Sequence, residues 1–101
     1  MSYGQVPCQS QMKRLSATIT GRVQGVSYRY YARREASSLG LTGWIRNETD
    51  GSVQIVAEGD EESLKELLRY LNQGSPLARV ERVDFDLLPA SGEFTTFYVR
   101  F

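Results

Sequence analysis

The chain has 101 residues, enough for one domain of ordinary size, and its 41% apolar content supplies a single hydrophobic core. Twelve basic residues balance twelve acidic ones, so the chain lacks the positive surplus of a protein that holds long nucleic acid; any anion it binds should be small and bound locally. The absence of histidine excludes His-based acid–base chemistry and most zinc sites, and the single cysteine, Cys8, excludes an internal disulfide and fits a reducing compartment.

The first residues do not look like part of the folded domain. Residues 1–12 are polar and show no periodicity, which predicts a flexible N-terminal tail, with residues 13–101 forming the domain. No apolar run approaches membrane-spanning length, and the N-terminus lacks the apolar core of a secretory signal. We therefore expect a cytoplasmic monomer with no membrane partner and no nucleic-acid partner.

The first half of the domain predicts a strand, a helix and a hairpin. Alternating residues indicate the strand: Leu15, Ala17, Ile19, Gly21 and Val23. Residues at helical spacing indicate a helix that ends near Gly40: Tyr28, Tyr31, Ala32 and Leu39. Two short strands follow, one with Gly43, Ile45 and Asn47 on one face, the other with Val53, Ile55 and Ala57. The Asp50-Gly51 pair between them is a strong hairpin signal.

The second half predicts a helix and two strands. The helix begins at about Asp60 and ends before Gly74 and Pro76, with an apolar stripe of Leu64, Leu67, Leu68 and Leu71. A strand covers residues 79–87, where the apolar set shifts phase between Val80 and Val83 and suggests a bulge. After a turn at residues 89–92, a last strand carries Phe97, Val99 and Phe101. The acidic residues near the second helix, Glu58, Asp60, Glu61 and Glu62, are explained by the preference of helix N-termini for negative charge.

The element order predicts an α+β fold. The first six elements follow the ferredoxin-like split βαβ order, which gives a mainly antiparallel sheet of about five strands with two helices on one face. In a strand–helix–strand unit the two strands point the same way. The end of the first strand and the end of the second, where Asn47 lies, should therefore meet at one edge of the sheet.

The segment between the first strand and the first helix breaks an electrostatic rule. It reads Gly21-Arg22-Val23-Gln24-Gly25-Val26-Ser27-Tyr28-Arg29, and no Asp or Glu occurs between Arg22 and Arg34. A helix N-terminus carries partial positive charge, and the second helix obeys the rule by opening Asp60-Glu61-Glu62-Ser63. Exposed amides, a helix N-terminus and a guanidinium that converge on one point form a phosphate site. Arg29 and the loop amides are therefore candidates for binding an external anion.

Both candidates also have plainer interpretations. The loop can be an ordinary glycine turn with Arg29 on the surface, and Asn47 can be a strand-end residue before the hairpin. If they act together, Asn47 can orient a water molecule, because an amide both donates and accepts hydrogen bonds.

Two segments resemble the signatures of the acylphosphatase family. The first is residues 21–29, and the second is Gly43-Trp44-Ile45-Arg46-Asn47-Glu48-Thr49-Asp50-Gly51-Ser52-Val53. The resemblance extends over about residues 14–101. It implies a small ferredoxin-like enzyme that hydrolyses the carboxyl-phosphate bond of acyl phosphates and releases inorganic phosphate. It also implies that no metal, no cofactor and no phosphoenzyme take part.

The resemblance assigns roles to individual residues. Arg29 and Asn47 would be catalytic, with Asn47 positioning the attacking water, and the phosphate would be bound by residues of the loop: Gln24, Gly25, Val26, Ser27, Tyr28 and Arg29. The family position of Ser27 is often glycine and that of Tyr28 is often phenylalanine. The serine raises the question of whether its hydroxyl touches the phosphate.

Other functions and contacts stay open at this stage. A ferredoxin-like sheet can also serve as an RNA-binding module or as a non-catalytic phosphate-binding domain. The carboxylate of Phe101 is a further candidate partner for Arg29. No charged recognition feature is evident beyond the phosphate site, which predicts loose selectivity for the acyl part of a substrate.

Overall fold

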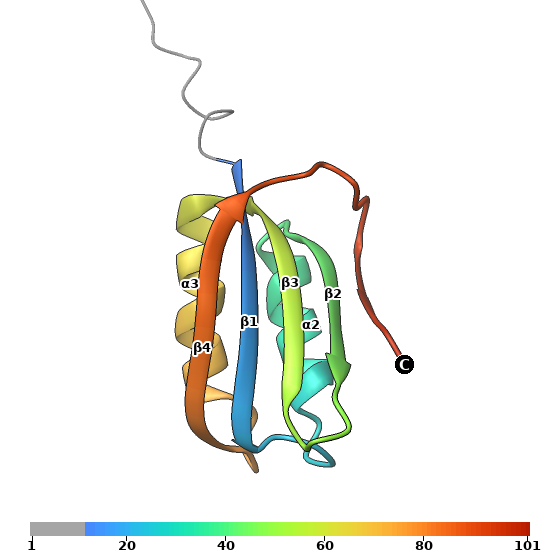
Figure 1. The fold of residues 1–101 in the computed structure, drawn as a ribbon, viewed down its shortest axis with the longest axis vertical. Helices are drawn as coiled ribbons and strands as arrows, with labels where there is room; N and C mark the ends of the chain where they lie inside the picture. The colour runs from blue at the N-terminus through green and yellow to red at the C-terminus, as the bar shows by residue number, and fades with distance from the viewer. Residues whose placement is uncertain (1–11) are drawn as a thin grey trace, which may run out of the picture.

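The computed structural model describes residues 12–101, and the predicted tail with Cys8 lies outside these residues except for Met12. The elements follow the predicted order (Figure 1): β1 (Met12–Arg22), α2 (Tyr28–Ser38), β2 (Thr42–Asn47), β3 (Val53–Asp60), α3 (Glu61–Gln73), β4 (Arg79–Pro89) and β5 (Phe97–Val99). Met12 already belongs to β1, where it pairs with Asp60.

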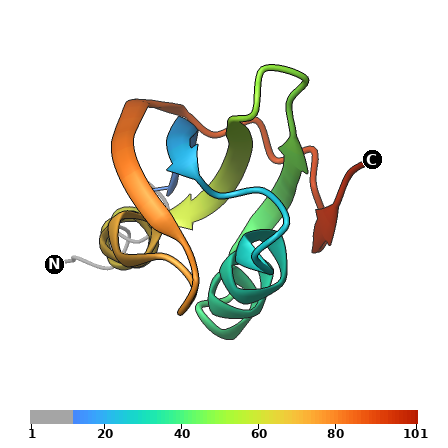
Figure 2. The same cartoon turned by 90° about the horizontal axis from the view of Figure 1, so that it is seen from below.

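One five-stranded sheet carries both helices on the same face (Figure 2), which confirms the predicted α+β ferredoxin-like architecture. The strand order is β4-β1-β3-β2-β5, and only the β2–β5 pairing is parallel. Strands β1 and β2 are both antiparallel to β3, which lies between them, so they are parallel to each other. Their C-terminal ends therefore meet at one edge of the sheet, as the sequence predicted.

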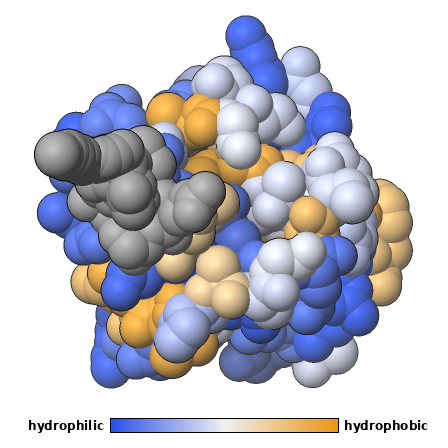
Figure 3. Space-filling view, turned by 90° about the horizontal axis from the view of Figure 1, so that it is seen from above, coloured by the Kyte–Doolittle hydropathy of each residue, from blue (hydrophilic) through white to orange (hydrophobic). Residues whose placement is uncertain are grey.

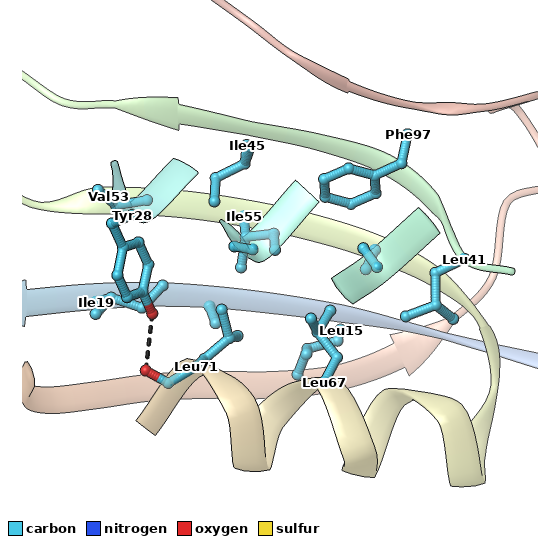
Figure 4. Packing of buried hydrophobic residues seen from close by; sticks show 14 of the residues in the cluster. Leu15, Ile19, Tyr28, Leu41, Ile45, Val53, Ile55, Leu67, Leu71 and Phe97 are labelled. Atoms are coloured by element: carbon cyan, nitrogen blue, oxygen red, sulfur yellow. Dashed lines mark hydrogen bonds between the residues drawn. The ribbon is translucent and has the colours of Figure 1, made fainter. Parts of the chain in front are cut away.

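The core fills the space between the sheet and the helices (Figure 4). The sheet contributes alternate residues, which are almost fully buried: Leu15, Ala17, Ile19, Ile45, Val53, Ile55 and Ala57. The helices contribute one face each: Tyr28, Ala32 and Ala36 from α2, and Leu64, Leu67 and Leu71 from α3. The predicted periodicities are thus confirmed, although Tyr31, Leu39 and Leu68 are only partly buried.

The two helices begin in opposite ways. Asp60 caps α3 by accepting a hydrogen bond from the backbone N–H of Ser63 (3.0 Å), and this bond lowers the pKa of the Asp60 carboxyl. Glu61 and Glu62 add negative charge to the first turn of α3. The first turn of α2 holds no acidic residue, and Ser27 at its N-cap makes no side-chain cap hydrogen bond within the described structure.

A β-bulge interrupts the pairing between β1 and the edge strand β4. The register shifts between Thr20 and Gly21, which pair with Arg82 and Val80, so Glu81 is the extra residue. Gly21 has a φ of 127°, and a Cβ there would collide with the carbonyl oxygen of Arg79. The bulge predicted from the phase shift between Val80 and Val83 is therefore confirmed. A glycine is required at position 21 because β4 approaches it closely.

Glu58 does not serve the N-terminus of α3, contrary to the sequence-based explanation. Its side chain is 3% exposed and pairs with Arg14 (2.7 Å). It also accepts hydrogen bonds from the backbone N–H groups of Ser91 and Gly92, both at 2.9 Å. Glu58 thereby ties the connection between β4 and β5 to the sheet. Burial would raise the pKa of Glu58, but these hydrogen bonds and Arg14 lower it to about 2.

The end of the chain differs from the prediction. Strand β5 ends at Val99, and Phe101 is fully exposed beyond it.

Across residues 12–101, no helix is long and apolar enough to cross a membrane. The end of the molecule remote from the N-terminus of α2 shows hydrophilic residues interspersed with apolar ones (Figure 3).

The buried carboxylate predicts an acid-sensitive contribution to stability. The pKa of Glu58 falls from 4.5 to about 2 on folding, so its charged form stabilises the fold at neutral pH. Glu58→Gln should lower the free energy of unfolding by about 3 kcal/mol at pH 7, measured by urea denaturation. This stabilisation is complete above the unfolded pKa and is lost as the pH falls toward 2, so wild type and variant should converge in acid.

Asp84→Asn is the matched control, because it removes one carboxylate charge from the exposed pair with Arg82. Its effect should stay below about 0.5 kcal/mol. A Glu58→Gln variant no less stable than Asp84→Asn would contradict the assigned role.

Candidate active site

The loop before α2 presents backbone amides that have no hydrogen-bond partner among residues 12–101. Gly25 and Ser27 both have positive φ, 74° and 62°, which turns the chain sharply into the helix. No backbone N–H from Gly25 to Tyr30 donates to another described residue; the first amide of this region that does so is that of Tyr31, which bonds the carbonyl of Ser27 (3.2 Å). The unpaired amides and the helix N-terminus form a site suited to an anion.

Side chains behind the loop hold it in place. Ser75, which is buried, donates its hydroxyl to the carbonyl of Val26 (2.8 Å). Tyr28 donates its hydroxyl to the carbonyl of Leu71 (2.8 Å, Figure 4). Burial raises the pKa of Tyr28, so the hydroxyl stays protonated and keeps donating. The first contact uses a carbonyl of the loop and the second uses a core side chain. Neither occupies a backbone N–H of the loop.

Gln24 connects the loop to the β2–β3 hairpin. Its side-chain amide donates to the carbonyls of Glu48 (2.8 Å) and Ser52 (2.9 Å). The Gln24 side chain is therefore directed at the hairpin that follows Asn47. The segment that supplies Arg29 and the segment that supplies Asn47 are thereby joined directly.

Arg29 is a cation of the pocket that the described part of the chain leaves without an acidic partner. It makes no ion pair with any residue in the described range. Its guanidinium carbon lies 5.3 Å from the centroid of the Phe101 ring, a cation–π distance. The carboxylate of Phe101, a candidate partner from the sequence, is not within ion-pair distance of Arg29, and the ring of Phe101 makes the contact instead.

Asn47 ends β2, belongs to the wall of the pocket described below and carries a buried side-chain oxygen that lacks a partner among the described residues. Its Oδ1 atom is buried and accepts no hydrogen bond from the described residues. A buried polar acceptor without a partner is unfavourable, and one in a native structure calls for an explanation. A water or ligand bound beside Asn47 would satisfy it.

These groups line one pocket of about 280 Å³. The sequence-predicted residues in its wall are Gly25, Ser27, Tyr28, Arg29 and Asn47. The side chains of Gln24 and Val26 are not part of the wall. The lining contains two arginines and no acidic residue, so the pocket favours anions.

The wall contains five further residues: Val23, Tyr30, Arg33, Val99 and Phe101. Phe101 was a candidate neighbour of Arg29, through its carboxylate, and the other four were missed by the sequence analysis. Arg33 could have been found, because it stands four residues after Arg29 and lies on the same side of a helix. Val99 could not, because nothing local to residues 97–101 indicates that β5 adds to the β2 edge.

A model of the acylphosphatase family matches residues 15–99 of the chain, which is most of its length. The chain belongs to the acylphosphatase family. Two acylphosphatases illustrate the sequence similarity within it. That of Methylococcus capsulatus is 54% identical over 88 residues, covering 87% of this chain and 96% of the relative. That of Salinibacter ruber is 51% identical over 88 residues, covering 87% of this chain and 93% of the relative.

Solved acylphosphatase structures share the fold. An acylphosphatase from Coxiella burnetii superposes with a TM-score of 0.86 at 32% identity, covering 95% of this chain and 100% of that structure. The acylphosphatase from Bacillus subtilis gives a TM-score of 0.85 at 31% identity, covering 88% of this chain and 99% of that structure. The resemblance noted in the sequence is therefore confirmed at the level of family and fold.

The contact between the loop and the hairpin in this acylphosphatase-family protein can be tested with a near-isosteric change. Gln24→Glu replaces the side-chain NH₂ group, which donates to two carbonyl oxygens, with a carboxylate oxygen that can only accept. The free energy of unfolding at pH 7 should therefore fall by at least about 2 kcal/mol. The deficit should shrink in acid, where a protonated carboxyl can donate. Urea denaturation at both pH values measures it.

Gln54→Glu makes the same chemical change on β3, where Gln54 forms no side-chain hydrogen bond with another described residue. Its effect should stay within about 0.5 kcal/mol. Equal losses in the two variants would show that the Gln24 contacts do not fasten the hairpin.

Proposed function

We propose that the protein is an acylphosphatase, which hydrolyses the carboxyl-phosphate bond of acyl phosphates to a carboxylate and inorganic phosphate. The observation that carries the proposal is the convergence of three features in one pocket of a family member. These are the loop amides, the Arg29 guanidinium and the Oδ1 of Asn47, none of which has a hydrogen-bond or ion-pair partner within residues 12–101.

The phosphoryl group is proposed to bind at the N-terminus of α2. The amides from Gly25 to Arg29 donate to its oxygens, and Arg29 adds a full positive charge. The negative charge missing from the first turn of α2 is then supplied by the substrate. Phosphoryl transfer needs chiefly positioning and stabilisation of charge, which these groups provide.

Asn47 is proposed to orient the attacking water. Its Oδ1 accepts a hydrogen bond from the water, which turns a lone pair of the water oxygen toward phosphorus. A bond forms between this oxygen and phosphorus as the bond from phosphorus to the carboxylate oxygen breaks. The water protons leave with the phosphate product and the solvent. Because a carboxylate is a good leaving group, the step needs no strong base.

The chain's single cysteine and balanced charge support action on small acyl phosphates in the cytoplasm rather than on nucleic acid.

Replacing the two proposed catalytic residues should have different effects on phosphate affinity and on kcat. Arg29→Ala should weaken binding of inorganic phosphate and lower kcat for acetyl phosphate, by about a hundredfold or more, because it removes the cation that holds the phosphoryl group. Asn47→Ala should lower kcat by about a hundredfold or more while phosphate affinity stays within about twofold, because it acts on the water. Calorimetry and a phosphate-release assay measure the two effects.

Arg34→Ala and Asn72→Ala are the controls, since both residues are exposed, Arg34 on α2 like Arg29 and Asn72 on α3, and both lie outside the pocket wall. Both should keep activity within about twofold. A folded Arg29→Ala or Asn47→Ala variant with a rate near that of wild type would refute the assigned roles. Phosphate binding with no turnover in the wild type would support a non-catalytic module instead.

The position of attack has a direct isotopic readout. Hydrolysis of acetyl phosphate in water enriched in ¹⁸O should place the label in phosphate and not in acetate, because water attacks phosphorus. A chelator should leave the rate unchanged, because Arg29 and the helix N-terminus supply the positive charge. Label in the acetate would contradict attack at phosphorus, and loss of activity with the chelator would contradict a metal-independent reaction.

A further inference from the structure

The pocket contains a second arginine, Arg33, to which the proposed hydrolysis gives no role. It is exposed on α2, one turn after Arg29, and forms no ion pair with another described residue. Like charges four residues apart repel each other and weaken a helix. No described residue with an acidic side chain lines the pocket, and the carboxylate of Phe101, a residue of the wall, forms no ion pair with Arg33.

The topology places Arg33 at the end of the pocket away from the phosphoryl group. Strand β5 runs parallel to β2 and pairs Val99 with Ile45, two residues before Asn47. Helix α2 runs the opposite way, because it returns the chain from the end of β1 to the start of β2. Phe101 stands over Arg29, so Arg33, about 6 Å further along the helix, comes level with Val99.

The position of the phosphoryl group determines how the rest of the substrate lies in the pocket. With the phosphoryl group at Arg29 and the loop amides, the acyl group occupies the rest of the pocket, between α2 and β5. There the wall combines the apolar side chains of Val99 and Phe101 with the guanidinium of Arg33. An apolar spacer followed by an anionic group matches this wall.

We propose that Arg33 is a specificity-determining residue that favours acyl phosphates whose acyl group carries a second anionic group, such as a carboxylate. A guanidinium binds a carboxylate through two parallel hydrogen bonds, which fixes the far end of the substrate. The inference rests on the proposed function, because it takes the phosphoryl group to sit at Arg29. It revises the sequence-based expectation of loose selectivity, which did not include Arg33 in the site.

The test compares 3-carboxybenzoyl phosphate with its methyl ester, which has nearly the same shape without the charge. The rigid ring also prevents the carboxylate from attacking its own acyl group. Wild type should prefer the carboxylate substrate by about fivefold in kcat/KM, the strength of a good exposed ion pair. The preference should fall with added salt. Arg33→Gln should abolish it, and Arg33→Lys should keep part of it.

Arg34→Gln removes the same charge from the neighbouring position, which lies outside the pocket, and should keep the full preference. The ratio of the two substrates within each variant cancels any general effect of charge on phosphate binding. A wild type without the preference, or an Arg33→Gln variant that retains it, would overturn the proposal. Failure of the wild type to hydrolyse either substrate would instead overturn the proposed acylphosphatase activity, and this inference with it.

Discussion

The site depends on hydrogen bonds that hold the loop before α2 from behind. Gln24, through its side chain, bonds the hairpin carbonyls, Ser75 bonds the carbonyl of Val26, and Tyr28 bonds the carbonyl of Leu71. None of them consumes a backbone N–H of the loop. The loop is thus fixed in shape while its donors stay available, which is the condition for electrostatic preorganisation. A loop held through its own amides would be equally rigid but unable to bind an anion.

The contrast between the two helices shows how stability and function are divided. Helix α3 begins with Asp60 as a bonded cap and two glutamates, all of which favour the helix. Helix α2 begins with a serine of positive φ, no cap bond and an arginine in its first turn. Deviations from local preference of this kind concentrate at functional sites, where packing elsewhere maintains them. Here the buried faces of α2 and α3 and the hydrogen bond of Tyr28 provide that packing.

The sequence predicted the parts of the structure that rest on local periodicity and chain direction. Alternation in β1 and the parallel direction of β1 and β2 were enough to place Arg29 and Asn47 at one edge. Other features rest on contacts between distant segments and leave no local pattern. From its position in the sequence, Glu58 looks like one of the acidic residues that favour a helix N-terminus. In the structure it is buried and accepts a hydrogen bond from the backbone N–H of Ser91. Likewise, the ring of Phe101 reaches Arg29 only because β5 pairs with β2.

Strand β5 has a consequence for how the pocket opens. It spans three residues, pairs with one neighbour and is joined to β4 by a connection that Glu58 anchors at a distance. Short edge segments open locally at lower free energy than central strands such as β1 and β3. The side of the pocket formed by Val99 and Phe101 therefore belongs to a smaller cooperative unit than the centre of the sheet. We expect slow amide hydrogen exchange in β1 and β3 and fast exchange in β5, even though β5 is hydrogen-bonded to β2.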